Sequence, residues 1–542
     1  MAYQDSFGVT FSDDGKVLIK CPDDFEGSYI IPNSVTEIGP AAFFCCRWLT
    51  AIVIPNSVTE IGDYTFNGCS GLTSIVIPDI IKSKQIGEGA FWGCYGLTSI
   101  VIPNSVTKIG LAAFSGCSGL TSIVIPNSVT EIGGGAFGGC SGLTAISIPN
   151  SVTEIGGNAF LGCSGLTEIN VSPQNMVYAS DEGVLFNKQK TVLVRFPEGK
   201  VGEYSIPNSV TEIGGAAFSG CSGLTSIVIP NSVTKIGEGA FRGCSGLTAI
   251  SIPNSVTEIR SSAFSGCSGL TAISIPNSVT KIGDYALSGC SGLTSIVIPN
   301  SVTEIGDYTF NGCSGLTAIS IPNGVTKIAE HAFSGCSGLT SIVIPNGVTK
   351  IDYDAFSGCS GLTSIVIPNG VTEIGGAAFS GCSGLTAISI PNSVTEIGYS
   401  AFRGCSGLTE INLSPQNMVY ASDEGVLFNK QKTVLVRFPE GKVGEYSIPN
   451  SVTEIGSSAF RGCSGLTSIV IPNSVTEIGG DAFYGCSNLT TINIPDSVME
   501  IDDEAFSGCS GLITINIPKG TTSKFIRCGL SEYQHLLVEK DI

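Results

Sequence analysis

An internal period of 23 residues constrains the fold of this chain more than any other feature. The repeated unit reads Ile-Pro-Asn-Ser-Val-Thr-Glu-Ile-Gly-x-x-Ala-Phe-x-Gly-Cys-Ser-Gly-Leu-Thr-x-Ile-x and recurs eighteen times. A fixed period of this length predicts stacked structural repeats, although a length of 542 residues would otherwise suggest several domains. The 70 Gly and 25 Pro residues, with only 13% charged residues, fit short buried strands that alternate with tight turns.

Each part of the unit predicts one wall of a turn. The segment Leu-Thr-x-Ile-x-Ile-Pro alternates with period two and stops at a proline, so we expect a short strand that pairs in parallel with its copies. The segment Gly-x-x-Ala-Phe-x-Gly-Cys has apolar residues at helical spacing, which predicts a helical or 3₁₀ turn on the opposite wall. The fold class is therefore a repeat solenoid of the α/β or mainly β kind, in which each turn buries its apolar ring only by stacking.

One position of the ring is almost invariant along the chain. It is Phe in every turn except one, where Leu287 replaces it. A smaller side chain in such a column leaves a deficit of volume that typically costs about 1–3 kcal/mol. We therefore expect a weak turn at Leu287.

Two identical 32-residue inserts interrupt the repeat, and each predicts a β-hairpin. A diverged third copy stands at the N-terminus, where it would cover the apolar end of the first turn, and the last residues suit a short amphipathic helix as a cap. The predicted organisation is an N-terminal hairpin cap (1–30), six turns (31–173), a hairpin (174–205), nine turns (206–415), a hairpin (416–447), three turns (448–517) and a C-terminal cap (518–542).

Charge and hydropathy exclude some classes of partner. The net charge of −19 disfavours nucleic acid, because binding to a phosphate backbone needs clustered Lys and Arg. No stretch approaches the about 20 apolar residues of a membrane helix, and the first residues lack a signal-peptide pattern. We expect a protein partner, no membrane span, and a monomer or weak self-association.

The sequence offers little for catalysis or cofactors. The two histidines, His331 and His535, are far apart, and eighteen of the 21 cysteines occur once per turn on the inward face. In-register parallel side chains keep their Cβ atoms about 4.8 Å apart, too far for a disulfide, and a file of thiols does not converge on zinc. We expect no enzyme activity, no catalytic residues, no metal and no cofactor.

The residue after Val-Thr alternates between Glu and Lys from Glu212 to Lys327. Opposite charges on adjacent turns attract, so this alternation indicates self-compensation along an exposed edge. Calcium binding is the rival interpretation, but the Asp-rich turns of nonapeptide repeats are absent from the sequence.

Two surfaces could contact a partner. The outward positions of the strand are small, Ser-Ile-Val or Ala-Ile-Ser, and lack the aromatic and Arg side chains that anchor tight interfaces. Larger side chains occur in the opposite turns, and these are the candidate contact residues: Tyr64, Trp92, Arg242, Tyr285, Tyr308, Tyr353, Tyr399, Arg403, Arg461 and Tyr484.

The repeat resembles the BspA-like leucine-rich repeats, a 23-residue class marked by Ile-Gly-x-x-Ala-Phe-x-x-Cys-x-x-Leu, over essentially the whole chain. The resemblance implies a cell-surface or secreted adhesin-like protein that binds a host or bacterial surface protein. The many free thiols leave a reducing, cytoplasmic compartment open. A structural scaffold that self-associates through its hairpin strands is the alternative function.

Overall fold

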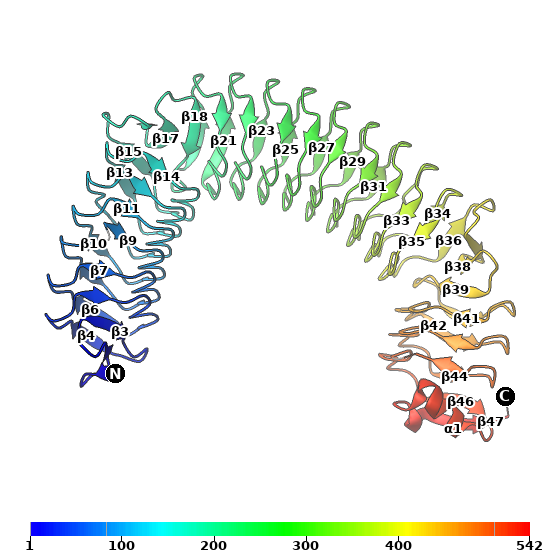
Figure 1. Cartoon of the computed structure of the whole chain (residues 1–542). Helices are drawn as coiled ribbons and strands as arrows, with labels where there is room; N and C mark the ends of the chain where they lie inside the picture. The colour runs from blue at the N-terminus through cyan, green and yellow to red at the C-terminus, as the bar shows by residue number, and fades with distance from the viewer. Residues whose placement is uncertain (1, 83, 503, 542) are drawn as a thin grey trace. The chain divides into compact units, whose positions relative to one another are not determined.

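The computed structural model describes residues 2–82, 84–502 and 504–541. The chain divides into two compact units, residues 1–256 with 262–270 and residues 257–261 with 271–542. Each unit is a stack of short turns, as the succession of strands in Figure 1 shows. The predicted repeat solenoid with stacked parallel strands is confirmed.

The predicted strand of each turn forms one wall, whose outward side we call the strand face. Val76 pairs with Val101 and Ser74 with Ser99, so the register advances by one whole repeat. In the N-terminal unit its strands are β4 (Gly27–Ile30), β6 (Leu49–Val53), β8 (Ser74–Val76), β10 (Ser99–Val101), β13 (Ala145–Ile148), β15 (Glu168–Val171), β19 (Gly202–Ser205), β21 (Leu224–Val228) and β23 (Ala249–Ser251). In the C-terminal unit they are β25 (Ala272–Ser274), β27 (Ser295–Val297), β29 (Ala318–Ser320), β31 (Ser341–Val343), β34 (Ala387–Ile390), β36 (Glu410–Leu413), β40 (Gly444–Ser447), β42 (Leu466–Val470), β44 (Thr491–Asn493) and β46 (Thr514–Pro518).

A second column of two-residue strands, absent from the sequence prediction, forms at the charged residue after Val-Thr and the Ile that follows. In the N-terminal unit these are β5 (Glu37–Ile38), β7 (Glu60–Ile61), β9 (Gln85–Ile86), β11 (Lys108–Ile109), β12 (Glu131–Ile132), β14 (Glu154–Ile155), β20 (Glu212–Ile213) and β22 (Lys235–Ile236). In the C-terminal unit they are β24 (Glu258–Ile259), β26 (Lys281–Ile282), β28 (Glu304–Ile305), β30 (Lys327–Ile328), β32 (Lys350–Ile351), β33 (Glu373–Ile374), β35 (Glu396–Ile397), β41 (Glu454–Ile455), β43 (Glu477–Ile478) and β45 (Glu500–Ile501).

The wall opposite the strand face, the turn wall, differs from the prediction in one detail. The expected helical or 3₁₀ turn is a pair of tight turns, closed by bonds such as Ala42 N–H to Gly39 C=O (3.3 Å). Between them the amide of Phe43 donates to Thr65 C=O of the next turn (2.9 Å), and Ala41 takes the left-handed conformation (φ 52°). A helix would need successive amides to bond within their own turn, whereas here alternate amides bond to the neighbouring turn.

The core is a file of apolar rings that runs through each unit. Val106, Phe114, Cys117 and Leu120 are fully buried, as are their equivalents in most other turns. Neighbouring Phe rings stack, with centroids 5.3 Å apart for Phe91 and Phe114. Leu287, in the C-terminal unit, is also fully buried.

The inserts form the predicted hairpins and add one strand that the sequence did not reveal. In the first insert β16 (Tyr178–Asp181), β17 (Val184–Asn187) and β18 (Val192–Arg195) are antiparallel, and β18 then pairs in parallel with β20. The second insert repeats this with β37 (Tyr420–Asp423), β38 (Val426–Asn429) and β39 (Val434–Arg437). The N-terminal copy, β1 (Tyr3–Gln4), β2 (Thr10–Phe11) and β3 (Val17–Lys20), joins β5 in the same way.

A buried ion pair connects each internal insert to the turns on both sides. Arg195 pairs with Glu198 and donates to the carbonyl of Ala216 (2.6 Å), while Glu198 accepts from the amide of Gly162 (2.6 Å). Arg437 and Glu440 repeat these contacts in the C-terminal unit. At the N-terminus, the corresponding pair is Lys20 and Asp23 and is exposed.

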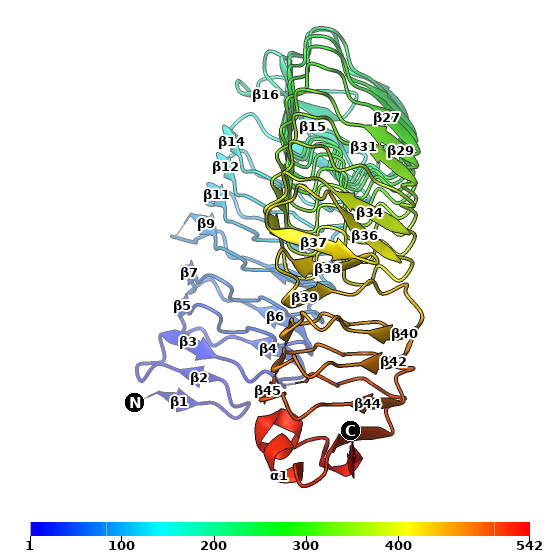
Figure 2. The ribbon, with the colours of Figure 1, turned by 90° about the vertical axis from the view of Figure 1, so that its right-hand side faces the viewer.

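The C-terminal cap is only in part the predicted amphipathic helix. The one-turn helix α1 (Thr522–Phe525), visible in Figure 2, runs into a π-helical turn, Ile526–Leu530, that bends at Gly529 (φ 121°). A 3₁₀ turn, Gln534–Leu536, then leads to β47 (Leu537–Lys540), which pairs in parallel with β46. Phe525 and Leu530 are buried, so the cap covers the last turn.

Candidate binding surfaces

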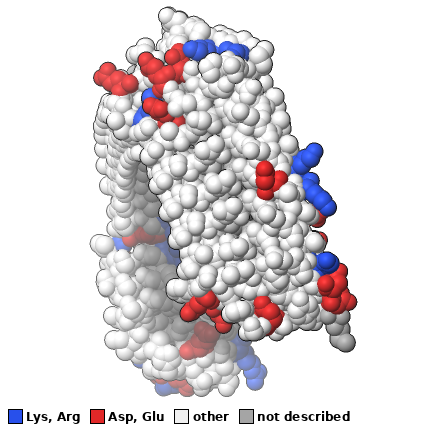
Figure 3. Space-filling model, turned by 90° about the vertical axis from the view of Figure 1, so that its left-hand side faces the viewer, with Lys and Arg blue, Asp and Glu red and all other residues white. Residues whose placement is uncertain are grey.

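The strand face of the N-terminal unit carries an uninterrupted file of exposed aliphatic side chains. We call Ile30, Val53, Val76, Val101 and Val124 the apolar column. Backbone pairing places Ile30 beside Val53 and Val101 beside both Val76 and Val124. These side chains are 55 to 77% exposed, because the alternation that buries Ile75 and Ile77 turns Val76 outward. On the face shown in Figure 3, charged side chains lie mainly near the margins.

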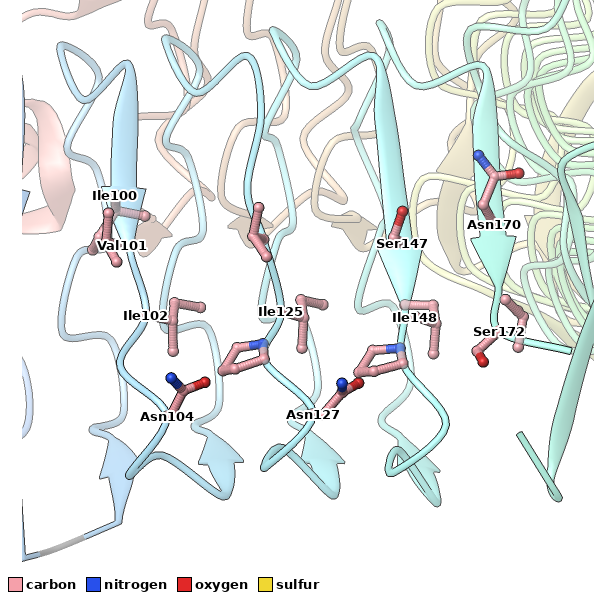
Figure 4. Close-up of a pocket in the computed structure, with 14 residues that line it drawn as sticks. Ile100, Val101, Ile102, Asn104, Ile125, Asn127, Ser147, Ile148, Asn170 and Ser172 are labelled. Atoms are coloured by element: carbon pink, nitrogen blue, oxygen red, sulfur yellow. The ribbon is translucent and has the colours of Figure 1, made fainter. Parts of the chain in front are cut away.

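The apolar column leads into an open hollow of about 800 Å³ on the strand face, drawn in Figure 4. Val101 and Val124 line its beginning, Ser147 and Asn170 extend from β13 and β15, and Asn104 lies on a neighbouring loop. Its lining contains no ionisable side chain among the residues that the structure describes. The hollow can therefore offer apolar contacts and amide or hydroxyl hydrogen bonds, but no acid or base.

The ten candidate contact residues all lie on the turn wall, at three positions of the repeat. Tyr64, Tyr285 and Tyr308 take the left-handed conformation, Tyr353 and Tyr399 directly precede that position, and the other five follow the buried aromatic residue. Trp92 and Tyr399 are 49 and 65% exposed. Among the described residues, no ring contact, ion pair or side-chain hydrogen bond joins another of the ten to Tyr64, Trp92, Arg242, Tyr399 or Arg403.

Two groups among the ten are brought together. In the three-turn segment (448–517), which we call the third block, the Arg461 guanidinium lies 4.0 Å from the centroid of the Tyr484 ring and pairs with Asp481. In the nine-turn segment (206–415), the second block, Tyr285, Tyr308 and Tyr353 form one file with His331, which is not among the ten predicted contact residues. The available signal was the period, because residues 285, 308 and 331 occupy the same position of three successive repeats.

The cysteine column is free and almost entirely buried, with Cys509 half-buried. Its thiols donate to backbone carbonyls of the preceding turn, as Cys117 does to Phe91 (3.1 Å). Burial raises the pKa of Cys163 and Cys382 to about 12, so these thiols stay protonated and unreactive at neutral pH. They act as small packing groups.

The predicted charge compensation between turns is confirmed for two pairs of the run from Glu212 to Lys327, whereas Lys327 itself pairs with Asp352; a further pair of the same kind forms beyond the run. Lys235 pairs with Glu212 (2.6 Å), Lys281 with Glu304 (2.5 Å) and Lys350 with Glu373 (2.8 Å). Within the described ranges no three His, Cys, Asp or Glu side chains converge so that they could hold a metal ion. In the same part of the chain, the helices are too short and too polar to cross a bilayer.

The fold and its repeat define a leucine-rich-repeat solenoid. A model of the BspA type leucine rich repeat region matches residues 26–83, 84–199, 194–317, 303–424 and 437–534. The chain therefore belongs to the BspA type leucine-rich-repeat family.

Several solved bacterial structures are similar. A leucine-rich repeat protein from Eubacterium ventriosum is 27% identical over 70% of this chain and 94% of that chain, with a TM-score of 0.49. A leucine rich cell surface protein from Faecalibacterium prausnitzii is 29% identical over 63% of this chain and 94% of that chain, with a TM-score of 0.42. A Bacteroides ovatus leucine-rich repeat protein is 26% identical over 96% and 98% of the two chains, with a TM-score of 0.31. The comparison with curated proteins gives no match.

Proposed function

We propose that this protein is a non-enzymatic binding solenoid, adhesin-like and surface-associated or secreted, that engages a protein on host or bacterial surfaces. The observation that carries the proposal is the apolar column. Scattered exposed aliphatic residues are ordinary on protein surfaces, whereas contiguous files of them mark interaction sites.

The geometry of the strand face suits an extended protein surface. Val76 and Val101 lie on paired strands and Val124 forms a parallel bridge with Val101, so their side chains present one regular row. The row ends at Ser147 and Asn170, which could bond to backbone groups of a partner. Because the hollow lining has no ionisable group among the described residues, binding there would depend on burial of apolar area and on neutral hydrogen bonds.

The test is binding of the fluorescently labelled protein to intact host epithelial cells and intact bacteria. A Val76→Asp/Val101→Asp variant would place two charges in the middle of the apolar column, and we expect at least a tenfold loss of cell binding. The matched control is Val76→Thr/Val101→Thr, which keeps β-branched side chains and should bind more strongly than the Asp variant. Protease treatment of the cells should abolish binding, because the partner is a protein.

Binding that is equal for the native protein and the Asp variant would contradict the role of the apolar column. Absence of binding to both cell types would contradict the adhesin proposal. The alternative, a self-associating scaffold, is favoured by the terminal positions of β1, β16 and β37 in their sheets. Light scattering across a hundredfold concentration range distinguishes the two, since a scaffold grows with concentration and a binding module stays monomeric or weakly associated.

A further inference from the structure

The turn wall of the C-terminal unit carries a file of four rings, which we call the aromatic ladder: Tyr285, Tyr308, His331 and Tyr353. The centroids of Tyr285 and Tyr308 are 4.5 Å apart and those of Tyr308 and His331 4.3 Å, with nearly parallel planes (9° and 15°). Tyr353 closes the file edge-on against His331, at 5.5 Å and 72°. Tyr285 and Tyr353 are 42 and 49% exposed, so the ladder is a surface feature.

The backbone holds these rings in register. Tyr285, Tyr308 and His331 all take the left-handed conformation, with φ between 51° and 57°. The amide of Tyr285 donates to Asp307 C=O (2.8 Å), that of Tyr308 to Glu330 C=O (2.8 Å) and that of His331 to Tyr353 C=O (3.0 Å). A partner would therefore meet a preorganised row of rings and would lose little entropy in ordering it.

Carboxylates line the aromatic ladder. Asp284 accepts from the amide of Asp307 (3.0 Å), and Asp307 accepts from the amide of Glu330 (3.1 Å). His331 Nε2 lies 3.7 Å from Glu330 and 3.6 Å from Asp354. Desolvation raises the pKa of the Tyr308 hydroxyl, and the negative charges of Glu330, Asp307 and Asp354 act in the same direction.

The carboxylates that line the ladder differ from nearby carboxylates that form ion pairs with Lys. Asp352 pairs with Lys327 (2.6 Å) and Glu304 pairs with Lys281 (2.5 Å). For Asp284, Asp307, Glu330 and Asp354, no ion pair with Lys or Arg occurs among the described residues of this unit. The aromatic ladder thus combines carboxylates that have no ion pair with Lys or Arg and a row of rings whose ends, Tyr285 and Tyr353, are exposed, while Tyr308 and His331 are half-buried between their neighbours.

In the third block, a cation of the chain itself contacts a ring and a carboxylate. Tyr484 there has Arg461 stacked on its ring at 4.0 Å, and Asp481 pairs with the same guanidinium. The repeat positions that correspond to Arg461 beside the ladder carry Ser288, Asn311 and Ser334. The ladder therefore has rings and carboxylates, although at other positions of the repeat than Tyr484 and Asp481, and no Arg at the position of Arg461.

We propose that the aromatic ladder docks a Lys- or Arg-bearing segment of the protein partner, whose cationic groups lie against the rings and pair with Asp284, Asp307, Glu330 and Asp354. Ring faces attract cations, and the planar guanidinium both stacks on rings and bonds to carboxylates, so Arg should bind more tightly than Lys. This inference rests on the proposed protein-binding function and assigns the chemistry of one contact surface.

The experiment uses the full chain and a fluorescein-labelled peptide with four Gly-Arg repeats, titrated by fluorescence anisotropy at 50 mM NaCl. Gly-Lys and Gly-Glu peptides of equal length are the comparison probes. We expect affinity in the order Arg, then Lys, with no binding of the Glu peptide. Tyr308→Leu, which keeps the net charge, should weaken Arg-peptide binding at least fivefold, and so should Asp284→Asn/Asp307→Asn.

Tyr64→Leu is the matched control, because Tyr64 has the same repeat position and left-handed conformation but bonds to Glu88 through its hydroxyl. This variant should bind the Arg peptide as the native protein does. Tyr308→Phe keeps the ring and should retain binding, and circular dichroism establishes that each variant is folded. If Tyr308→Leu fails to fold, the comparison of Asp284→Asn/Asp307→Asn with the native protein decides.

Equal Arg-peptide binding by the native protein, Tyr308→Leu and Tyr64→Leu would overturn the inference and leave only nonspecific attraction to an acidic protein. Loss of peptide binding in Tyr308→Leu, with the control intact, supports it. The cell-binding assay separates the two proposals. Peptide binding without any cell binding would contradict the adhesin function, and cell binding without ladder-dependent peptide binding would contradict only the ladder.

Discussion

At the scale of single residues, glycine allows neighbouring turns to approach closely, because it has no Cβ atom. A Cβ atom added to Gly142, in the Ser-Gly-Leu part of the repeat, would lie 2.5 Å from the carbonyl oxygen of Ser118 in the preceding turn. A Cβ atom added to Gly157 would meet nothing within 4 Å. A side chain at residue 142 would therefore press on the preceding turn, whereas one at residue 157 would meet open space.

We predict that Gly142→Ala lowers the free energy of unfolding by about 1–3 kcal/mol, because the backbone of two turns must move apart. Gly157→Ala, the matched control, should be neutral or slightly stabilising. Urea denaturation followed by circular dichroism measures both. A loss of similar size in the two variants would show that contact between turns is not the cause.

Leu287 is the one departure from Phe in the buried aromatic column. Leu287 is fully buried in a position where most turns have Phe, so Leu287→Phe should raise the unfolding free energy by about 1 kcal/mol by filling the deficit. Phe333→Leu, in the same block, should lower it by about 1–3 kcal/mol. Denaturant midpoints check both changes, and a destabilised Leu287→Phe would mean that the neighbours have closed around Leu287.

At the scale of elements, the internal inserts are held by buried charge and the N-terminal copy is not. The Arg195 and Glu198 side chains are 8 and 5% exposed, whereas those of Lys20 and Asp23 are 43 and 65% exposed. An insert inside the stack has to bond to a turn on each side, and the guanidinium of Arg195 reaches the carbonyls of Ala216 and Ser219. The N-terminal copy joins the described turns through β3, which pairs with β5.

Arg195→Leu should therefore lower the free energy of unfolding by about 3–5 kcal/mol, since it leaves Glu198 buried without its partner. Lys20→Leu, the exposed counterpart, should cost less than about 1 kcal/mol. Limited proteolysis within residues 174–205, compared with denaturant midpoints, is the measurement. A double variant, Arg195→Leu/Glu198→Leu, that is more stable than Arg195→Leu alone would confirm that the uncompensated carboxylate causes the loss.

At the scale of the whole molecule, a column of buried thiols makes stability sensitive to alkali. Burial raises the pKa of Cys163, Cys221, Cys382 and Cys463 from the ordinary value of 9.0 to about 12. A thiol whose pKa is higher in the folded chain loses its contribution as the pH rises, because the unfolded chain releases the proton first. The contribution is complete below pH 9 and declines between pH 9 and pH 12.

We predict that thermal midpoints fall steeply above pH 9. Each such thiol should lower the free energy of unfolding by about 1.4 kcal/mol per pH unit. Cys221→Ala lacks one of these thiols, so its unfolding free energy should decline with pH less steeply than that of the native protein. Calorimetry between pH 7.5 and 10.5 measures the slopes. Equal slopes for the two proteins would show that ionisation of Cys221 does not contribute.

Much of the architecture follows from the period alone, since a repeat that cannot bury its own apolar ring has to stack. The inward positions of Leu72, Ile75 and Cys69 were predictable, because alternation and spacing fix which side chains face the core. The first strand of the insert, Tyr178–Asp181, was not predictable, because it contains no apolar alternation; it pairs with Val184–Asn187. The turn wall was predicted as helical because spacing within one turn does not reveal bonds to the next.

For the candidate binding residues, too, the sequence predicts one part and only the structure shows the other. The sequence by itself determined that Tyr285, Tyr308 and Tyr353 are outward, since the inward positions of the repeat were already filled. Only the tertiary structure decided that they stack with His331 and that Arg461 is already engaged by Tyr484 and Asp481. The physical reason is that a repeat pattern records which wall a side chain belongs to, whereas its partners on that wall lie a full turn away and are set by how the turns stack.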